Sequence, residues 1–190
     1  DLCTYSFHPV KHITTGEGGA ILTNDEEQYQ KLSLLIKHGI DRREEMFSEK
    51  ERIGSWIYDM DALGFNYRLT DFQAALGISQ LKKIDKIKAS RRKIVNYYNE
   101  HFEDFDELIL PFEDKNVDSN FHLYILQVKD NQKFDRYDFF KYLQSKYYQP
   151  MVHYIPVHLL GYYKKRYCYK RGDFPVSEYF YDRAVSIPLY

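Results

Sequence analysis

The stretch SFHPVKHITTGEGGAILTND, residues 6–25, sets one lysine, Lys11, between two histidines and just ahead of a glycine cluster. The segment LCTYSF (residues 2–7) has the β-branched and aromatic character of a buried strand, and Pro9 ends it. The run GGAILT (residues 18–23) predicts a second strand after the turn. Lys11 is therefore expected in a connection between two strands.

Two interpretations of Lys11 fit this position. A lysine in a surface loop is ordinarily a solvated charge, whereas one held in a tight turn beside close-packed backbone can be a Schiff-base nucleophile. Pyridoxal phosphate would suit such an amine, because it offers an aldehyde to the amine and a phosphate to a neighbouring anion site. Ser6 could present a hydroxyl to that phosphate, and Gly16, Gly18 and Gly19 would let the backbone approach a flat ring. The spacing alone leaves both interpretations open.

Length and charge narrow the class of protein. The chain of 190 residues is long enough for one well-packed domain or two small ones. Its net charge of -1, from 27 basic and 28 acidic side chains, favours neither nucleic acid nor an anionic membrane as a partner. No apolar run is long enough to span a bilayer and no leader opens the chain, so we expect a cytoplasmic protein.

The cysteines and tyrosines add two expectations. Cys3 and Cys168 are far apart and lack metal-ligand spacing, which indicates reduced thiols, with a structural disulfide as the alternative. The 19 tyrosines favour clefts or subunit interfaces, since a buried phenol needs a hydrogen-bond partner. This composition favours an oligomer.

The first half of the chain predicts two helices separated by a long loop. Residues 24–38 carry a capping Asn or Asp, early acids and a following glycine, whereas residues 40–63 lack a steady period. Thr70 and Gln73 form a capping box that opens one long helix, which we expect to reach residue 103 and to bridge two domains. The apolar stripe expected along it comprises Leu81, Ile84, Ile87, Ile94, Tyr98 and Phe102.

The second half predicts a small domain after a charged linker at residues 112–120. Residues 121–128 indicate a strand, residues 134–147 an amphipathic helix, and residues 149–158 a strand that runs into a proline-bent loop. This order predicts a β-α-β element. A further helix is expected within residues 175–187.

Three segments together resemble one family. The opening stretch, GFNYRLTDFQAALGISQLKKID (residues 64–85) and VHYIPVHLLGYY (residues 152–163) are similar to the DegT/DnrJ/EryC1/StrS sugar aminotransferases, which are pyridoxal-phosphate enzymes of fold type I. The resemblance covers nearly the whole chain. The HYIPVH segment, the run YYKKRYCYKRGDFPVSE and the ending SIPLY look most like the subgroup that aminates UDP-4-keto-6-deoxy-N-acetylhexosamines in pseudaminic acid biosynthesis.

The resemblance implies roles for the first group of residues. Lys11 would be the Schiff-base lysine, which also moves a proton between the cofactor and C4 of the sugar, and Ser6 would bind the cofactor phosphate. Asn66 would reach the cofactor phosphate of the neighbouring subunit in a homodimer with shared active sites, beside the substrate. Arg68 would contact the nucleotide diphosphate, which a guanidinium can bind with two hydrogen bonds. Structural alternatives stay open: Asn66 could hold a turn and Arg68 could be a surface charge.

The second group would line the sugar-nucleotide pocket: Val152, His153, Tyr154 and His158. Packing roles for the two histidines stay open, and a metal site is not expected because no acids stand near them at ligand spacing. The implied cofactor is pyridoxal 5'-phosphate, the substrate a UDP-linked keto sugar and the amino donor glutamate. Another nucleotide-sugar aminotransferase, a related dehydratase or a non-catalytic dimerisation module are the alternatives.

The implied fold is α/β, as a fragment of a type I fold. Residues 1–69 would end the large cofactor-binding domain, residues 70–111 would form the bridging helix with a short exit strand, and residues 112–190 a small C-terminal α/β domain that is incomplete. The family's aspartate at the pyridine nitrogen and its phosphate-binding helix N-terminus have no counterpart here. We therefore expect the 190-residue segment to be inactive by itself.

Overall fold

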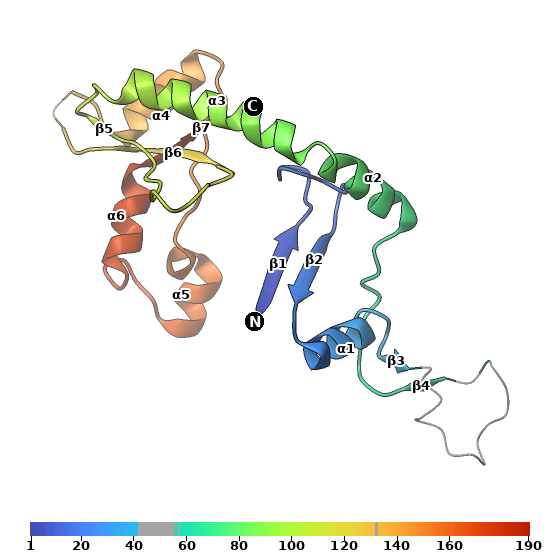
Figure 1. Cartoon of the computed structure of the whole chain (residues 1–190). Helices are drawn as coiled ribbons and strands as arrows, with labels where there is room; N and C mark the ends of the chain where they lie inside the picture. Colours follow the sequence, from blue (N-terminus) through green and yellow to red (C-terminus); the bar gives the residue numbers. More distant parts are fainter. Residues whose placement is uncertain (42–55, 57, 132) are drawn as a thin grey trace. The chain divides into compact units, whose positions relative to one another are not determined.

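A computed structural model describes residues 1–41, 56, 58–131 and 133–190. Its described residues divide into two compact units, Asp1–Ile84 and Asp85–Tyr190 (Figure 1). Each unit is described separately.

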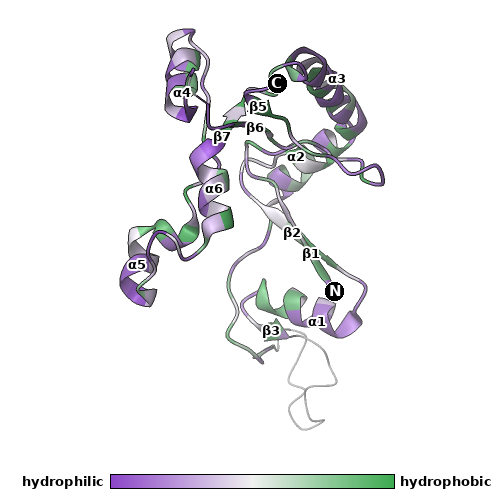
Figure 2. Ribbon diagram, turned by 90° about the vertical axis from the view of Figure 1, so that its left-hand side faces the viewer, coloured by the Kyte–Doolittle hydropathy of each residue, from purple (hydrophilic) through white to green (hydrophobic). Residues whose placement is uncertain are grey.

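The first unit is built around a β-hairpin. Strand β1 (Leu2–Ser6) pairs antiparallel with β2 (Gly19–Thr23), with Leu2 opposite Thr23 and Ser6 opposite Gly19. The two predicted strands and the intervening position of Lys11 are thus confirmed, whereas β1 is exposed along its whole length and not buried as its composition predicted. Figure 2 shows the apolar character of β1, and apolar side chains on the hairpin are about half exposed, as at Leu22 (57%).

Helix α1 (Glu26–Leu35) follows the hairpin, and Asp25 caps it by accepting a hydrogen bond from the backbone N–H of Gln28 at 3.0 Å. Strand β3 (Ile40–Asp41) then pairs antiparallel with β4 (Asp59–Met60). These two short strands hold the ends of the predicted 40–63 loop together, while residues 42–55 and 57 lie outside the described residues.

The predicted long helix is two helices, α2 (Asp71–Leu81) and α3 (Ile84–Phe102). Thr70 and Gln73 form the predicted capping box. The prediction of one continuous helix was wrong, because the backbone N–H of Lys83 donates to the carbonyl of Gln80 at 2.9 Å. That three-residue bond tightens the last turn of α2 and ends its four-residue ladder. Of the predicted apolar stripe, Leu81 is 56% exposed, whereas Ile94, Tyr98 and Phe102 pack against the core of the second unit.

The second unit contains a three-stranded antiparallel sheet in the order β5 (Leu108–Ile109), β6 (Tyr124–Val128), β7 (Ala184–Ile187). The other elements of this unit are α4 (Arg136–Ser145), the 3-10 turn η3 (Val157–Leu159), α5 (Gly161–Tyr167) and α6 (Pro175–Arg183). The predicted β-α-β element was wrong. Residues 149–158 contribute a single bridge, Met151 to Ser186, and prolines on both sides of it lack the N–H that a longer ladder needs.

The core of the second unit lies between α3 and the sheet. Val95, Phe121, Tyr124, Leu126 and Leu189 are all buried there. The buried phenol of Tyr124 donates to Asn99 Oδ1 at 2.6 Å, and burial raises the pKa of Tyr124 to about 12. Cys3 and Cys168 are both free thiols, as predicted, and both are exposed.

Candidate active site

The loop that carries Lys11 is closed at its base by the backbone of Phe7. The N–H of Phe7 donates to the carbonyl of Gly18 at 2.9 Å, and the carbonyl of Phe7 accepts from Thr15 N–H and from the Thr14 hydroxyl, both at 3.0 Å. Within the loop, the N–H of Lys11 donates to the carbonyl of His8 at 2.9 Å. Lys11 is half-buried. Its backbone is therefore held in a defined turn at one end of the hairpin.

Ser6 lies at the same end of the hairpin as Lys11. It is the last residue of β1, opposite Gly19, and its exposed hydroxyl oxygen accepts from the N–H of His8 at 3.4 Å. The same residue, His8, thus contacts the hydroxyl of Ser6 and the turn of Lys11. The structure brings these two predicted residues into one short stretch of closed backbone.

The turn after the loop is packed onto the N-terminal half of α2. The side-chain amide of Gln73 donates to the carbonyl of Glu17 at 2.9 Å, and Thr15 is only 4% exposed. A Cβ on Gly77 would lie 2.9 Å from the Thr15 methyl, so glycine there lets the helix approach the turn. Helix α2, which the capping box begins, therefore packs against the Lys11 loop and supports it.

Asn66 and Arg68 lie on an extended segment that runs beside the end of α1. The N–H of Phe65 donates to the carbonyl of Leu35 at 2.8 Å, and Asn66 forms an isolated antiparallel bridge with Lys37. The side chains of Asn66 and Arg68 are both exposed. Their backbone is thus fixed while their side chains are available to a ligand.

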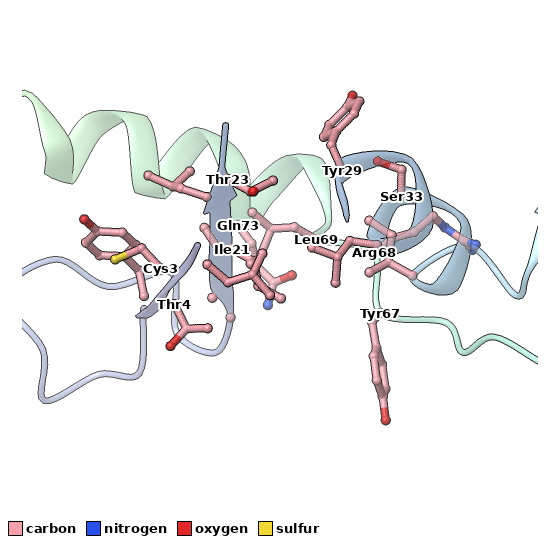
Figure 3. A pocket seen from close by; sticks show the side chains of 18 of the residues that line it. Cys3, Thr4, Ile21, Thr23, Tyr29, Ser33, Tyr67, Arg68, Leu69 and Gln73 are labelled. Atoms are coloured by element: carbon pink, nitrogen blue, oxygen red, sulfur yellow. The ribbon is translucent and has the colours of Figure 1, made fainter. Parts of the chain in front are cut away.

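A broad open groove of about 1200 Å³ lies along the hairpin, α1 and the segment before α2. Arg68 lines it together with Tyr67, Leu69 and Gln73, and in Figure 3 Tyr67 and Arg68 point in different directions from their shared segment. The predicted residues Lys11, Ser6 and Asn66 are not among the residues that line it. Of the predicted residues in this unit, the groove therefore brings in Arg68 alone.

The predicted pocket residues of the second unit lie on one irregular segment. Tyr154 is 72% exposed, while Val152 and His153 are half-buried. His153 Nδ1 lies 2.7 Å from the hydroxyl oxygen of Ser186, and burial lowers the pKa of His153. Its imidazole is held against β7 and favours the neutral form.

His158, at the end of that segment, faces inward. It is 7% exposed and its Nε2 lies 2.8 Å from Glu178 Oε1. Burial opposes ionisation of Glu178, yet the N–H of Gly172, His158 and the N–H of Phe174 together hold the pKa of Glu178 below its ordinary value. Glu178 was not among the predicted site residues. Its position in the first turn of a helix that Pro175 opens was the available signal, since acids there serve free backbone donors.

The residues of the first unit fit one part of a pyridoxal phosphate site. Lys11 supplies a primary amine on a fixed turn, and Ser6 supplies a hydroxyl beside it, which match the aldehyde and the phosphate of that cofactor. Within the described ranges no group of three His, Cys, Asp or Glu side chains is placed to hold a metal ion. No helix in the described part of the chain is both long and apolar enough to cross a membrane.

The sequence profile of the DegT/DnrJ/EryC1/StrS aminotransferase family matches residues 1–190. Among curated relatives, the protein MJ1066 of Methanocaldococcus jannaschii is 40% identical over 191 residues, which are 100% of this chain and 49% of the relative. The UDP-4-amino-4,6-dideoxy-N-acetyl-beta-L-altrosamine transaminase of Campylobacter jejuni is 36% identical, covering 100% of this chain and 47% of the relative. The spore coat polysaccharide biosynthesis protein SpsC of Bacillus subtilis is also 36% identical, over 100% of this chain and 49% of its own. The chain spans about half the length of these curated relatives.

Solved structures agree with these relatives. The sugar aminotransferase Spr1654 of Streptococcus pneumoniae, in its PMP form, has a TM-score of 0.88 at 29% identity and covers 100% of this chain and 48% of its own. The Helicobacter pylori aminotransferase PseC, described as involved in the biosynthesis of pseudoaminic acid, has a TM-score of 0.84 at 29% identity, over 98% and 47%. Spr1654 is also known in a PLP form. The prediction of an α/β fold, as a fragment of a type I fold, is confirmed.

Proposed function

Because the chain belongs to the DegT/DnrJ/EryC1/StrS aminotransferase family, whose aminotransferases depend on pyridoxal phosphate, we propose that it supplies part of the active site of such an enzyme. The enzyme would transfer an amino group from glutamate to C4 of a UDP-linked 4-keto-6-deoxy-N-acetylhexosamine, in a pathway of the pseudaminic acid type. The observation that carries this proposal is the placement of Lys11 on a closed turn beside Ser6. The names of the Campylobacter and Helicobacter relatives support the substrate class.

Lys11 has two tasks in this proposal. Its amine anchors the cofactor covalently. Once the amino donor has released it, the amine moves a proton between the cofactor and C4 of the sugar. When bound, pyridoxal phosphate supplies an electron sink for the reaction. The hydroxyl of Ser6 donates to the phosphate group and so fixes the ring near the Lys11 turn. The backbone bonds through Phe7 close the loop that carries Lys11, and the bond from Gln73 to the carbonyl of Glu17 ties that loop to α2.

The remaining predicted residues are proposed to serve the substrate and the partner subunit. Asn66 would reach the cofactor phosphate of the neighbouring subunit, which makes the enzyme a homodimer with shared sites. Arg68 would bind the diphosphate through its exposed guanidinium. One wall of the sugar pocket would be formed by Val152, His153 and Tyr154. His158, at the end of the same segment, would belong to that wall as well.

The test uses the full-length protein that contains this chain. We expect the purified enzyme to show the violet absorbance of a lysine-bound cofactor, and we expect Lys11→Ala to abolish that band. Lys31→Ala serves as a matched control, since Lys31 is an exposed lysine on α1. Survival of the band in Lys11→Ala would show that another lysine holds the cofactor.

A second assay tests the reaction itself. Glutamate should convert the cofactor absorbance, and a 4-keto sugar nucleotide should restore it with formation of an amino sugar that is detected by mass. Several candidate sugar nucleotides should be compared, because relatives with other names match the chain equally well. A dehydrated product in place of the amino sugar would overturn the assignment to transamination. A full-length protein that binds no cofactor would instead support a non-catalytic module.

A further inference from the structure

The predicted pocket wall of the second unit is attached at both ends to one continuous piece of structure. Helix α6 runs directly into strand β7, so Glu178 and Ser186 belong to consecutive elements. At its first end, Met151 exchanges two backbone hydrogen bonds with Ser186, at 3.1 and 2.7 Å. His153 adds a third contact to the same residue through the Ser186 hydroxyl, at 2.7 Å.

The second attachment is the contact between His158 and Glu178. Both side chains are 7% exposed, and their closest atoms are 2.8 Å apart. The imidazole of His158 is also enclosed by aromatic rings, with ring centroids 4.7 Å away at Phe174 and 6.4 Å away at Tyr169. This enclosure leaves the ring little freedom to turn toward solvent.

Glu178 is itself fixed by the start of α6. Its carboxylate oxygens accept from the N–H of Gly172 at 2.8 and 2.9 Å, and one of them accepts from the N–H of Phe174 at 3.3 Å. A carboxylate at a helix N-terminus is further stabilised by the helix dipole. Arg171 approaches Glu178 at 3.9 Å but is paired with Asp182 on the surface. The carboxylate therefore joins three parts of the chain: the loop before α6, the helix and His158.

Between the two attachments, the side chains of the segment differ in their exposure to solvent. Tyr154 is 72% exposed and Ile155 is 49% exposed, whereas His158 is buried. A ligand on the exposed side of this segment would meet Tyr154 and Ile155, while the Nε2 of His158 is already engaged by a carboxylate. We propose that His158 is a positioning residue, which acts through Glu178 to hold residues 153–157 in the conformation that receives the sugar nucleotide. This inference rests on the proposed function for the identity of the ligand.

A double-mutant cycle on the full-length enzyme tests the proposal. The variants are His158→Ala, Glu178→Ala and the double variant, and the measured quantities are kcat and KM for the sugar nucleotide. If His158 acts through Glu178, each single variant should raise KM by about tenfold, within the range of coupling between contacting residues. The double variant should then be no worse than the single ones. Multiplying effects would place His158 in direct contact with substrate and overturn the proposal.

Two further measurements separate positioning from general loss of structure. The half-reaction with glutamate leaves out the sugar nucleotide, so a loss of positioning should raise KM for the sugar nucleotide more than it lowers the rate of the glutamate half-reaction, whereas general loss of structure would impair both alike. His158→Gln should recover most of the affinity, because its amide can still donate to Glu178. If an alanine variant fails to fold, His158→Gln and Glu178→Gln carry the test, and a KM in His158→Gln as high as that expected for alanine would refute the proposal.

Hydrogen exchange provides a readout that does not depend on activity. The amides of residues 152–159 should exchange faster in His158→Ala and Glu178→Ala than in the wild type, because one attachment of the segment is lost. Asp182→Asn is the matched control. Asp182 lies on α6, as Glu178 does, and the substitution breaks its surface pair with Arg171 but leaves His158 untouched. Unchanged exchange would contradict the attachment, whereas an absent glutamate reaction in the wild type would contradict the proposed function alone.

Discussion

Alanine at Gly18 should disturb the Lys11 turn more than alanine at Gly16, which lies in the same loop and is also exposed. Gly18 has a φ of +145°, and a Cβ there would lie 2.6 Å from Thr15 Oγ1 and 2.9 Å from Leu69 Cδ1. Gly16 has a φ of +80°, and a Cβ there would meet nothing within 4 Å. The two positions therefore share backbone strain, and only Gly18 adds a steric conflict.

The expected magnitudes follow from these two terms. Strain from a side chain in a sparsely populated backbone region costs about 1–3 kcal/mol, which is the whole effect expected for Gly16→Ala. Overpacking adds about 1–3 kcal/mol, so Gly18→Ala should lower the free energy of unfolding by about 2–6 kcal/mol. Because Phe7 bonds to the carbonyl of Gly18, this variant should also reduce cofactor binding at Lys11.

Urea unfolding of the full-length protein measures the first effect, and the violet absorbance of the cofactor measures the second. Gly161→Ala is the matched control, because Gly161 begins α5 and a Cβ there would meet nothing within 4 Å. We expect it to be neutral. Equal losses of stability in Gly16→Ala and Gly18→Ala would refute the reasoning, since the contacts of Thr15 and Leu69 would then make no difference.

Three further predictions concern the second unit. Leu126→Ala, at a side chain with 0% exposure, should lower the free energy of unfolding by about 2–5 kcal/mol in urea denaturation. Tyr124→Phe should cost about 1–3 kcal/mol, because it leaves Asn99 Oδ1 without its donor, and alkaline titration should lose the phenol that titrates near pH 12. Since its pKa is lowered on folding, Glu178 stabilises the protein above its ordinary pKa of about 4.5 and loses that contribution as the pH falls through the folded value. Thermal stability measured from pH 7 to pH 3 should therefore fall less steeply in Glu178→Gln than in the wild type, and parallel curves would contradict this.

Local patterns predicted the elements of the first unit well. Alternation of strand, turn and glycine placed Lys11 between β1 and β2, and the Thr70 and Gln73 pair marked the start of α2. These features depend on residues close together in the sequence, such as a side chain that caps its own helix. The assignment of the family came from three local motifs for the same reason.

Pairings between distant residues were not accessible in this way. Pro150 and Pro156 were a local signal against a strand at residues 149–158, but the bridge from Met151 to Ser186 joins residues far apart in the sequence. The break between α2 and α3 was also missed, since two lysines within an otherwise helical pattern carry no stop signal. Helix periodicity continues across such a turn, so the pattern alone overestimates the length of the helix.

The sequence by itself determined that this protein has a lysine on a turn beside a strand-end hydroxyl, and that its motifs are those of one aminotransferase family. Only the tertiary structure decided which way the histidines of the third motif face. His153 and His158 are five residues apart in one segment, yet one is held by Ser186 and the other is buried against Glu178. The physical reason is that a buried imidazole takes its hydrogen-bond partner from whichever distant element packs against it, and spacing within a motif does not encode that element.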